Sequence, residues 1–215
     1  GRDARVLPKT VIYDPALTLT LPSALSAASG MNAIAHCAEA LYAHDGNPII
    51  SMMAEEGIRA LASALPTVVE DPANMEARSE SLYGAWLAGI TLGSAGVALH
   101  HKLCHVLGGT FNLPHAETHS IVLPHAMRYN RDAAPLAMAR IARALGTEDA
   151  PTGLYDLEVK LGLTLALKDI GMTEEGLERA ARIATDAPYP NPRAVEYDDT
   201  LALLRDAYEG QRPPK

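Results

Sequence analysis

The segment HHKLCHVLGGTFNLPHAETH, residues 100–119, places five histidines close together in a chain rich in alanine and leucine. Imidazole exchanges a proton near neutral pH, and it also binds divalent metals such as zinc and iron. His101 and His105 are four residues apart, so on a helix both rings lie on one face. His115 follows the Gly108–Gly109 break and can return toward that face. The spacing predicts a shared site for acid–base chemistry, anion binding or metal binding.

A second pair with helical spacing lies earlier in the chain. Asn32 and His36 are also four residues apart, so they share a face of another predicted helix. We interpret His36, His101, His105 and His115 as one convergent site built from two helices and a loop. The pattern alone leaves open whether that site holds a metal. Three other histidines are interpreted as surface or supporting residues: His44, His119 and His125.

The elements that must position these residues are predicted to be almost entirely helical. Aromatic residues make up only 5% of the chain and β-branched runs are few, which favours helix over sheet. Residues 10–13 are the best strand candidate, closed by Asp14-Pro15. Such a lone leading strand suggests a sheet completed outside this sequence. Helices are expected after Pro22 and over 49–65, 72–90, 93–109, 133–145, 154–170, 173–185 and 197–209, with a further helix that starts at 115. The helix over 49–65 is expected to stop at Pro66 or shortly after it, before Asp71-Pro72, and the helix from 115 is expected to be kinked or interrupted at Pro124.

Composition excludes several classes of function. The net charge of -8 and the pI of about 5.4 argue against a nucleic-acid partner, which needs a basic face. No apolar run approaches the ~20 residues of a membrane span, and no signal peptide is recognisable at the start. Cys37 and Cys104 lie in apolar helical patterns rather than in a disulfide framework. We therefore expect a cytoplasmic protein without a membrane partner.

Two motifs carry a resemblance to a known family. GMNAIAHCAEALY and HHKLCHVLGGTFNLPHAETHSIVLPHAMRYN resemble the iron-containing alcohol dehydrogenase superfamily and, within it, the maleylacetate reductases. LPKTVIYDPALTLTLP and NPRAVEYDDTLALLRDAYEG are similar to that family as well. The resemblance implies an all-α fold with one short leading strand, the helical C-terminal domain of the dehydroquinate synthase-like fold.

The same resemblance implies a domain division. Residues 1–20 would be strand and linker belonging to an N-terminal nucleotide-binding domain absent from this sequence, and 21–215 the helical catalytic domain. Gly108–Gly109 follows a predicted helix rather than a strand, so it does not form a dinucleotide-binding loop. We expect the nucleotide-binding domain to be supplied by the same or a separate chain, and a homodimer.

The resemblance also implies a metal site for iron or zinc. The superfamily holds the metal with an aspartate, a histidine four residues later, and two histidines fourteen apart. These positions correspond here to Asn32, His36, His101 and His115. The aspartate is replaced by Asn32, as in the maleylacetate reductases, and a neutral amide is a weaker ligand than a carboxylate. The replacement argues against tight metal binding.

The implied reaction is the reduction of maleylacetate, a small dicarboxylate, to 3-oxoadipate with NADH or NADPH. It needs donors for a developing enolate oxygen and a group that supplies a proton. Lys102 is a candidate for the oxyanion or a substrate carboxylate, and His105 for proton transfer or for orientation near the nicotinamide. His101 is the alternative proton donor. Further polar candidates are Arg128, Arg193 and Asn112, each more readily explained as a surface residue, whereas Glu117 is expected to cap a helix.

Two alternative functions stay open. One is a metal-dependent alcohol or polyol dehydrogenase of the same superfamily, which Asn32 disfavours. The other is a non-catalytic helical subunit, which the lack of a cofactor-binding domain in this sequence supports. The histidine cluster disfavours that second alternative, because burying polar imidazoles without a function is costly.

Overall fold

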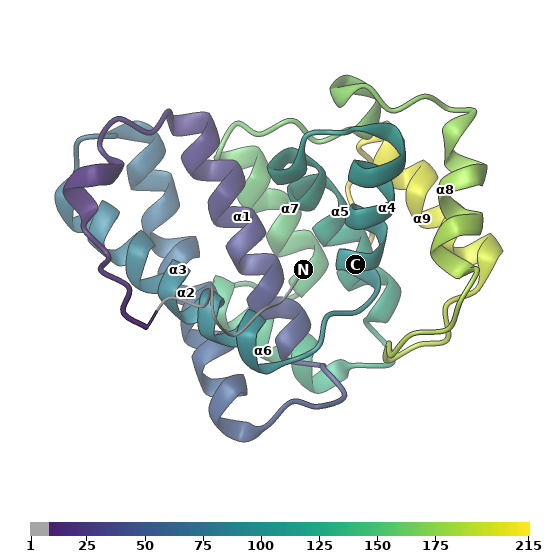
Figure 1. Ribbon diagram of the computed structural model, residues 1–215, viewed down its shortest axis with the longest axis horizontal. Helices are drawn as coiled ribbons and strands as arrows, with labels where there is room; N and C mark the ends of the chain where they lie inside the picture. The colour runs from purple at the N-terminus through teal and green to yellow at the C-terminus, as the bar shows by residue number, and fades with distance from the viewer. Residues whose placement is uncertain (1–8) are drawn as a thin grey trace.

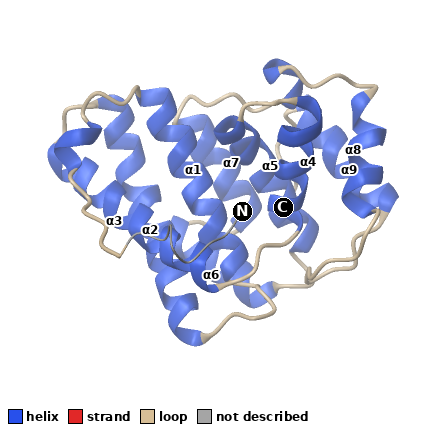
Figure 2. Ribbon diagram, in the orientation of Figure 1, coloured by secondary structure: helices blue, strands red, loops and turns tan. Residues whose placement is uncertain are grey.

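The computed structural model describes residues 9–215, and within that range the secondary structure is helical (Figure 2). A short 3₁₀ turn, η2 (Pro15–Thr18), leads into the first long helix. The α-helices are α1 (Ser23–Ala40), α2 (Pro48–Glu70), α3 (Met75–Ser94), α4 (Leu99–Phe111), α5 (His115–Asn130), α6 (Pro135–Leu145), α7 (Ala150–Lys160), α8 (Gly176–Thr185) and α9 (Tyr197–Glu209), with a 3₁₀ turn η3 (Leu167–Ile170) after α7. The prediction of an all-α fold is confirmed.

The predicted strand at residues 10–13 is wrong, because no strand is assigned anywhere in residues 9–215. Val11 and Ile12 are instead exposed. A strand exists only through hydrogen bonds to a neighbouring strand, and no described segment offers one. The β-forming residues alone were therefore an insufficient signal. The proposed boundary at residue 20 falls partly outside the described residues, since 1–8 are not covered.

Several helix boundaries follow local capping chemistry. The side chain of Asn47 accepts hydrogen bonds from the backbone of Ile49 and Ile50, and Pro48 occupies the first helical position of α2. Asn74 caps α3 in the same manner. Helix α2 includes Pro66 and ends at Glu70, so the stop expected shortly after this proline is confirmed. The interruption considered at Pro124 is wrong, because α5 runs without a break through it. Buried packing on both sides of these prolines outweighs the one backbone hydrogen bond that each removes.

Helix α5 lies at the centre of the packing, and almost every residue from 118 to 130 is buried. Helices α1 and α4 both pack on α5, as do α7 and α9. Helices α1 to α3 form one side of the molecule and α8 and α9 the other, with α4 to α7 between them (Figure 1). The predicted histidine-bearing helices are thus brought next to one another by their common packing on α5.

None of the individual helices in residues 9–215 has the length and apolarity of a membrane span. Only α3 and α4 taken together pass that test by length and composition, with a bend of 95° between them.

Candidate active site

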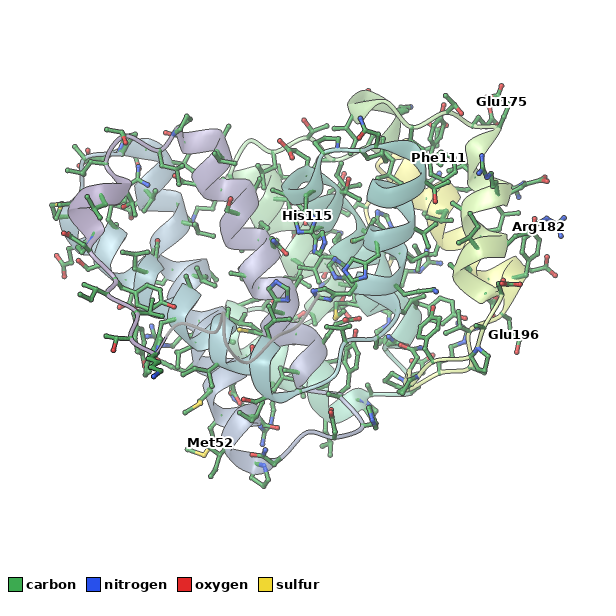
Figure 3. The ribbon with its side chains drawn as sticks, viewed as in Figure 1. Met52, Phe111, His115, Glu175, Arg182 and Glu196 are labelled. Atoms are coloured by element: carbon green, nitrogen blue, oxygen red, sulfur yellow. The ribbon has the colours of Figure 1, made fainter. Side chains whose placement is uncertain are left out.

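A pocket of about 600 Å³ opens between α1, α4, α5 and the segment that joins α3 to α4. In Figure 3, His115 lies in the region between α1 and α4. Five imidazoles line the pocket: those of His36, His101, His105, His115 and His119. The remaining lining residues are mostly small or apolar, from Leu92 to Val97, together with Asp45. The pocket therefore combines a nitrogen-rich wall with room for a small molecule.

A chain of short hydrogen bonds runs through the buried wall of the pocket. Glu39 Oε2 lies 2.7 Å from His101 Nδ1, and His101 Nε2 lies 2.7 Å from His36 Nδ1. Glu39 and His101 are almost fully buried, whereas His36 is half-buried at the pocket wall. The carboxylate, on α1, thus holds a ring of α4 against a second ring of α1. Such a carboxylate–histidine arrangement fixes both the orientation and the tautomer of the ring.

A second layer of imidazoles lies behind and beside this chain. His100 Nε2 donates a hydrogen bond to the backbone carbonyl of His119 at 2.8 Å. The ring centroid of His119 is 4.2 Å from that of His115 and 5.1 Å from that of His101. His119 is 1% exposed, and neither of its ring nitrogens has a hydrogen-bond partner among residues 9–215. A buried imidazole with free nitrogens at a pocket wall is available to bind a ligand.

Burial and mutual repulsion lower the pKa of several of these imidazoles. Burial and, after it, the neighbouring rings of His101, His115 and His105 together lower the pKa of His36 to about 4. Burial followed by the same kind of neighbours also lowers the pKa of His119 strongly. The pKa of the exposed His105 is lowered as well, first by partial burial and then by His101. At neutral pH His36 and His119 therefore offer hydrogen bonds rather than positive charge.

The structure brings together four of the residues that the sequence singled out, since His36, His101, His105 and His115 all line the pocket. Asn32 is not a lining residue, but its Oδ1 atom is buried without a hydrogen-bond partner. Lys102 is not a lining residue either. Its Nζ atom lies 5.6 Å from the ring centroid of Tyr189.

The remaining polar candidates are placed elsewhere. Arg128 pairs with Asp206, and Arg193 pairs with Asp199 while covering the ring of Tyr129. Asn112 ends α4 in the left-handed conformation, with φ of 55°. Glu117 lies in the first turn of α5, but no side-chain hydrogen bond caps that helix.

Sequence reasoning missed three residues of the site: Glu39, His100 and His119. A signal existed for two of them. Glu39 is three residues after His36 on the same helix, and His119 is four residues after His115, so both spacings place the pairs on common faces. His100 has no such spacing to a site residue. Its contact with the backbone carbonyl of His119 is seen only in the structure.

Several side chains at the site are potential ligands of a divalent metal. In residues 9–215, two groups have ligand atoms within 4.8 Å of one another, Glu39–His100–His101 and His100–Cys104–His119. Neither contains His36 or His115. The four positions singled out by the resemblance nevertheless offer three imidazoles and the free amide oxygen of Asn32, which are ligand types that zinc and iron accept. The residues fit a metal by type, without a carboxylate among them.

Comparisons with known proteins identify the family of this chain. Residues 26–208 match the model of the Fe-containing alcohol dehydrogenase family, C-terminal. The chain is 60% identical over 213 residues to a maleylacetate reductase of Burkholderia cepacia and 57% identical to one of Sphingobium indicum. Each alignment covers 99% of this chain and 60% of the relative.

A solved structure shares the same fold. The maleylacetate reductase of Agrobacterium tumefaciens superposes with a TM-score of 0.96 at 50% identity, over 99% of this chain and 61% of that chain. The chain thus spans about 60% of the length of the relatives it matches. On the match to the family model over most of its length, this chain belongs to the Fe-containing alcohol dehydrogenase family.

Proposed function

We propose that this chain supplies the substrate-binding and catalytic helices of an enzyme that reduces maleylacetate to 3-oxoadipate with NADH or NADPH. The observation that carries the proposal is the identity of 60% to a maleylacetate reductase over nearly the whole chain. The pocket supports it, because five imidazoles face a space large enough for a small dicarboxylate.

The reaction divides into a hydride step and a proton step. Hydride from the nicotinamide adds to the alkene carbon β to the ketone, and the electron pair of the double bond moves toward the ketone oxygen. The resulting enolate collects a proton at its α carbon, and the oxidised nicotinamide leaves. The enzyme must therefore bind an oxyanion and deliver one proton.

The neutral imidazoles suit the oxyanion. His119 has no internal hydrogen-bond partner at either ring nitrogen, so one N–H is free to donate to the enolate oxygen. Donors that are already oriented in a buried wall stabilise developing charge more than water does. We add His119 to the site on this ground.

The residue proposed to deliver the proton is the exposed histidine of the cluster, His105. His105 is exposed at the pocket, so its ring exchanges protons with water, whereas His101 is buried and held by Glu39. We propose His105 as proton donor or as the group that orients the nicotinamide, with His101 as the alternative donor. Lys102 lies over Tyr189 rather than at the pocket, so its assignment to a substrate carboxylate rests on sequence alone.

A divalent metal, zinc or iron, would be held by Asn32, His36, His101 and His115. When bound, it would supply Lewis-acid polarisation of the ketone oxygen. The lack of a carboxylate at position 32 predicts weak binding. Hydrogen bonds from this chain's imidazoles are the alternative source of oxyanion stabilisation.

The wider organisation is also a proposal. We infer that the dinucleotide is bound mainly by a nucleotide-binding domain that residues 21–215 do not provide, with residues 1–20 as the linker to it. That domain lies in the same polypeptide or in a partner chain. A homodimer in the cytoplasm is proposed from the similarity to the relatives and from the two buried, unpaired cysteines.

The test is a chimera in which this chain replaces the corresponding segment of the Burkholderia cepacia relative. We expect NADH oxidation that depends on maleylacetate. His105→Ala is expected to lower kcat by about 10²-fold, the usual contribution of a positioned acid or base. Lys102→Ala tests the sequence prediction for that residue. Tight zinc or iron binding together with alcohol oxidation, and without maleylacetate reduction, would contradict the proposal and favour an alcohol dehydrogenase.

A further inference from the structure

Glu39 is the most heavily used acceptor at the candidate site, although no catalytic role has been assigned to it above. Its side chain is 1% exposed. Oε2 accepts the backbone N–H of Ala98 at 2.7 Å, and Oε1 accepts the backbone N–H of His100 at 2.8 Å. The hydroxyl of Tyr42 donates to Oε1 at 3.2 Å. A buried carboxylate with this many donors is held in one orientation.

The two backbone bonds make Glu39 the cap of another helix. Ala98 precedes the first residue of α4 and has no capping side chain of its own. The first N–H groups of a helix lack partners within it, and their dipoles favour a negative charge. Glu39, which belongs to α1, meets this need from across the fold. The start of α4 is therefore fixed relative to α1 by one side chain.

The same carboxylate also fixes a ring of the site. His101 Nδ1 lies 2.7 Å from Oε2. A carboxylate only accepts hydrogen bonds, so Nδ1 of His101 carries the proton and Nε2 is directed to His36, 2.7 Å away. Helices α1 and α4 both pack on α5 but make few direct contacts with one another. The register between His36 on α1 and His101 on α4 thus depends on Glu39.

We propose that Glu39 is a positioning residue of the active site, acting through His101. It couples the start of α4 to the orientation and tautomer of the His101 ring, so that Nε2 is presented to His36 and the pocket. This inference deepens the proposed function and rests on it for the kinetic consequence. The geometric part, the protonated Nδ1 of His101, stands independently of which substrate is reduced.

The first experiment reads the ring state directly. Long-range ¹H–¹⁵N correlation spectra of this chain, with ¹⁵N-labelled histidine and with His101 assigned by His101→Gln, report which nitrogen is protonated at neutral pH. We expect Nδ1 of His101 to carry the proton. An unprotonated Nδ1 in the unsubstituted chain would overturn the proposal without recourse to any Glu39 variant.

The second experiment separates positioning from capping. Glu39→Leu removes every acceptor while keeping bulk, and Glu39→Gln leaves an acceptor at only one end of the group. Tyr42→Phe is the matched control, because it removes one donor from the same carboxylate and leaves the bonds to Ala98, His100 and His101. All are measured in the chimera below their melting temperatures, with circular dichroism confirming the helix content.

We expect kcat to fall by about 10- to 100-fold in Glu39→Leu, with a smaller fall in Glu39→Gln, as for other residues that orient an active-site histidine. KM for maleylacetate should stay within about threefold, and Tyr42→Phe should behave as the unsubstituted chimera. If Glu39→Leu does not fold, the kcat of Glu39→Gln and the protonation state of the His101 ring decide whether Glu39 is a positioning residue. An unchanged kcat in a folded Glu39 variant, with only a lower melting temperature, would reduce Glu39 to a helix cap. If the unsubstituted chimera reduces no maleylacetate, the proposed function fails, while the ring state still decides the role of Glu39.

Discussion

At the level of single residues, the carboxyl of Glu158 is one of the buried polar groups without a hydrogen-bond partner in residues 9–215. Its side chain on α7 is 1% exposed, and neither carboxyl oxygen has a hydrogen-bond partner within residues 9–215. Burial raises the pKa of Glu158 well above its usual range. The folded chain therefore holds this proton to a higher pH than the unfolded chain does, which lowers stability as pH rises above about 4.5.

Replacing this carboxyl should stabilise the protein. We expect Glu158→Met to raise the free energy of unfolding at pH 7 by roughly 1–3 kcal/mol, since it removes an unpaired buried polar group at similar volume. Urea unfolding followed by circular dichroism measures the change. Glu158→Gln, whose side chain stays polar but cannot ionise, should raise the free energy of unfolding by less. A loss of stability in Glu158→Met would show that the carboxyl has a partner that the structure does not reveal.

His125 provides the opposite pH dependence. Its ring is buried in α5, and burial lowers its pKa to about 4. The unfolded chain therefore binds a proton to this ring between about pH 6.5 and 4 that the folded chain does not, so stability falls as pH falls through that window. At ~1.4 kcal/mol per pKa unit, the share of His125 is about 3 kcal/mol. His125→Leu should flatten the curve of unfolding free energy against pH below 6.5, and an unchanged slope would contradict this assignment.

Position 32 tests the metal site at the level of one atom. We expect Asn32→Asp to tighten zinc binding by about tenfold or more, equivalent to ~1.4 kcal/mol, because a carboxylate replaces a neutral amide oxygen among three imidazoles. Isothermal titration of zinc into this chain measures the affinity. The matched control is Asn74→Asp, which adds the same charge at the cap of α3, a position where asparagine and aspartate are equally suitable. Equal affinities in the two variants would mean that residue 32 does not face the metal.

Residue types and spacings were enough to find part of the site. The four-residue spacing of His101 and His105 predicts a common face, and both rings line the pocket. Spacing does not reveal partners across helices, however. Glu39 appears in the sequence as a single acid in an apolar helix, and only the contact between α1 and the start of α4 shows that it binds two backbone amides and a ring.

At the scale of elements, α2 and α3 pack closely because two glycines face each other at their contact. A Cβ atom on Gly84 would lie 2.6 Å from Leu61 Cγ and 3.2 Å from the backbone oxygen of Gly57. A Cβ atom on Gly57 would lie 2.8 Å from Cys37 Sγ. The three helices α1 to α3 therefore depend on the absence of side chains at these two positions.

A methyl group at this contact should separate the helices. We expect Gly84→Ala to lower the free energy of unfolding by roughly 1–3 kcal/mol through overpacking. Gly89→Ala is the control on the same helix: its Cβ would meet only Tyr13 Oη, at 3.8 Å, so helix propensity should make it more stable by about 0.5–1 kcal/mol. Thermal unfolding of both variants gives the comparison, and equal changes would contradict the role of close packing.

Helix positions were predictable from apolar periodicity, whereas their ends depended on tertiary structure. The last helix, expected over 197–209, was predicted at its observed bounds. Pro66 and Pro124 both lie inside their helices, because neighbouring buried residues such as Leu65 and Leu123 hold each helix against the core. Asn112, considered for substrate binding, instead ends α4 with a positive φ, a backbone role that asparagine tolerates.

At the scale of the whole molecule, the common packing of α1 and α4 on α5 turns distant segments into one pocket. Residues 36 and 101 are separated in sequence by the end of α1 and by all of α2 and α3, yet their rings are 4.5 Å apart between centroids. Spacing within each helix suggested that His36, His101, His105 and His115 converge, and the family resemblance gave independent support for His36, His101 and His115. The places of His119 and Glu39 in the site are known only from the structure.

The last prediction concerns the binding of the dinucleotide. The glycine pair nearest the site, Gly108 and Gly109, lies inside α4 rather than in a turn between a strand and a helix, so it cannot cradle a pyrophosphate as a dinucleotide-binding loop does. We therefore expect this chain alone to show no saturable change in NADH fluorescence, whereas the chimera should bind NADH. Loss of one imidazole from the substrate pocket should not affect NADH binding. His115→Ala in the chimera should leave the NADH affinity within about threefold while lowering maleylacetate turnover. Saturable binding of NADH to the chain alone would place the nucleotide site among these helices. It would contradict the proposal that a separate domain binds the nucleotide.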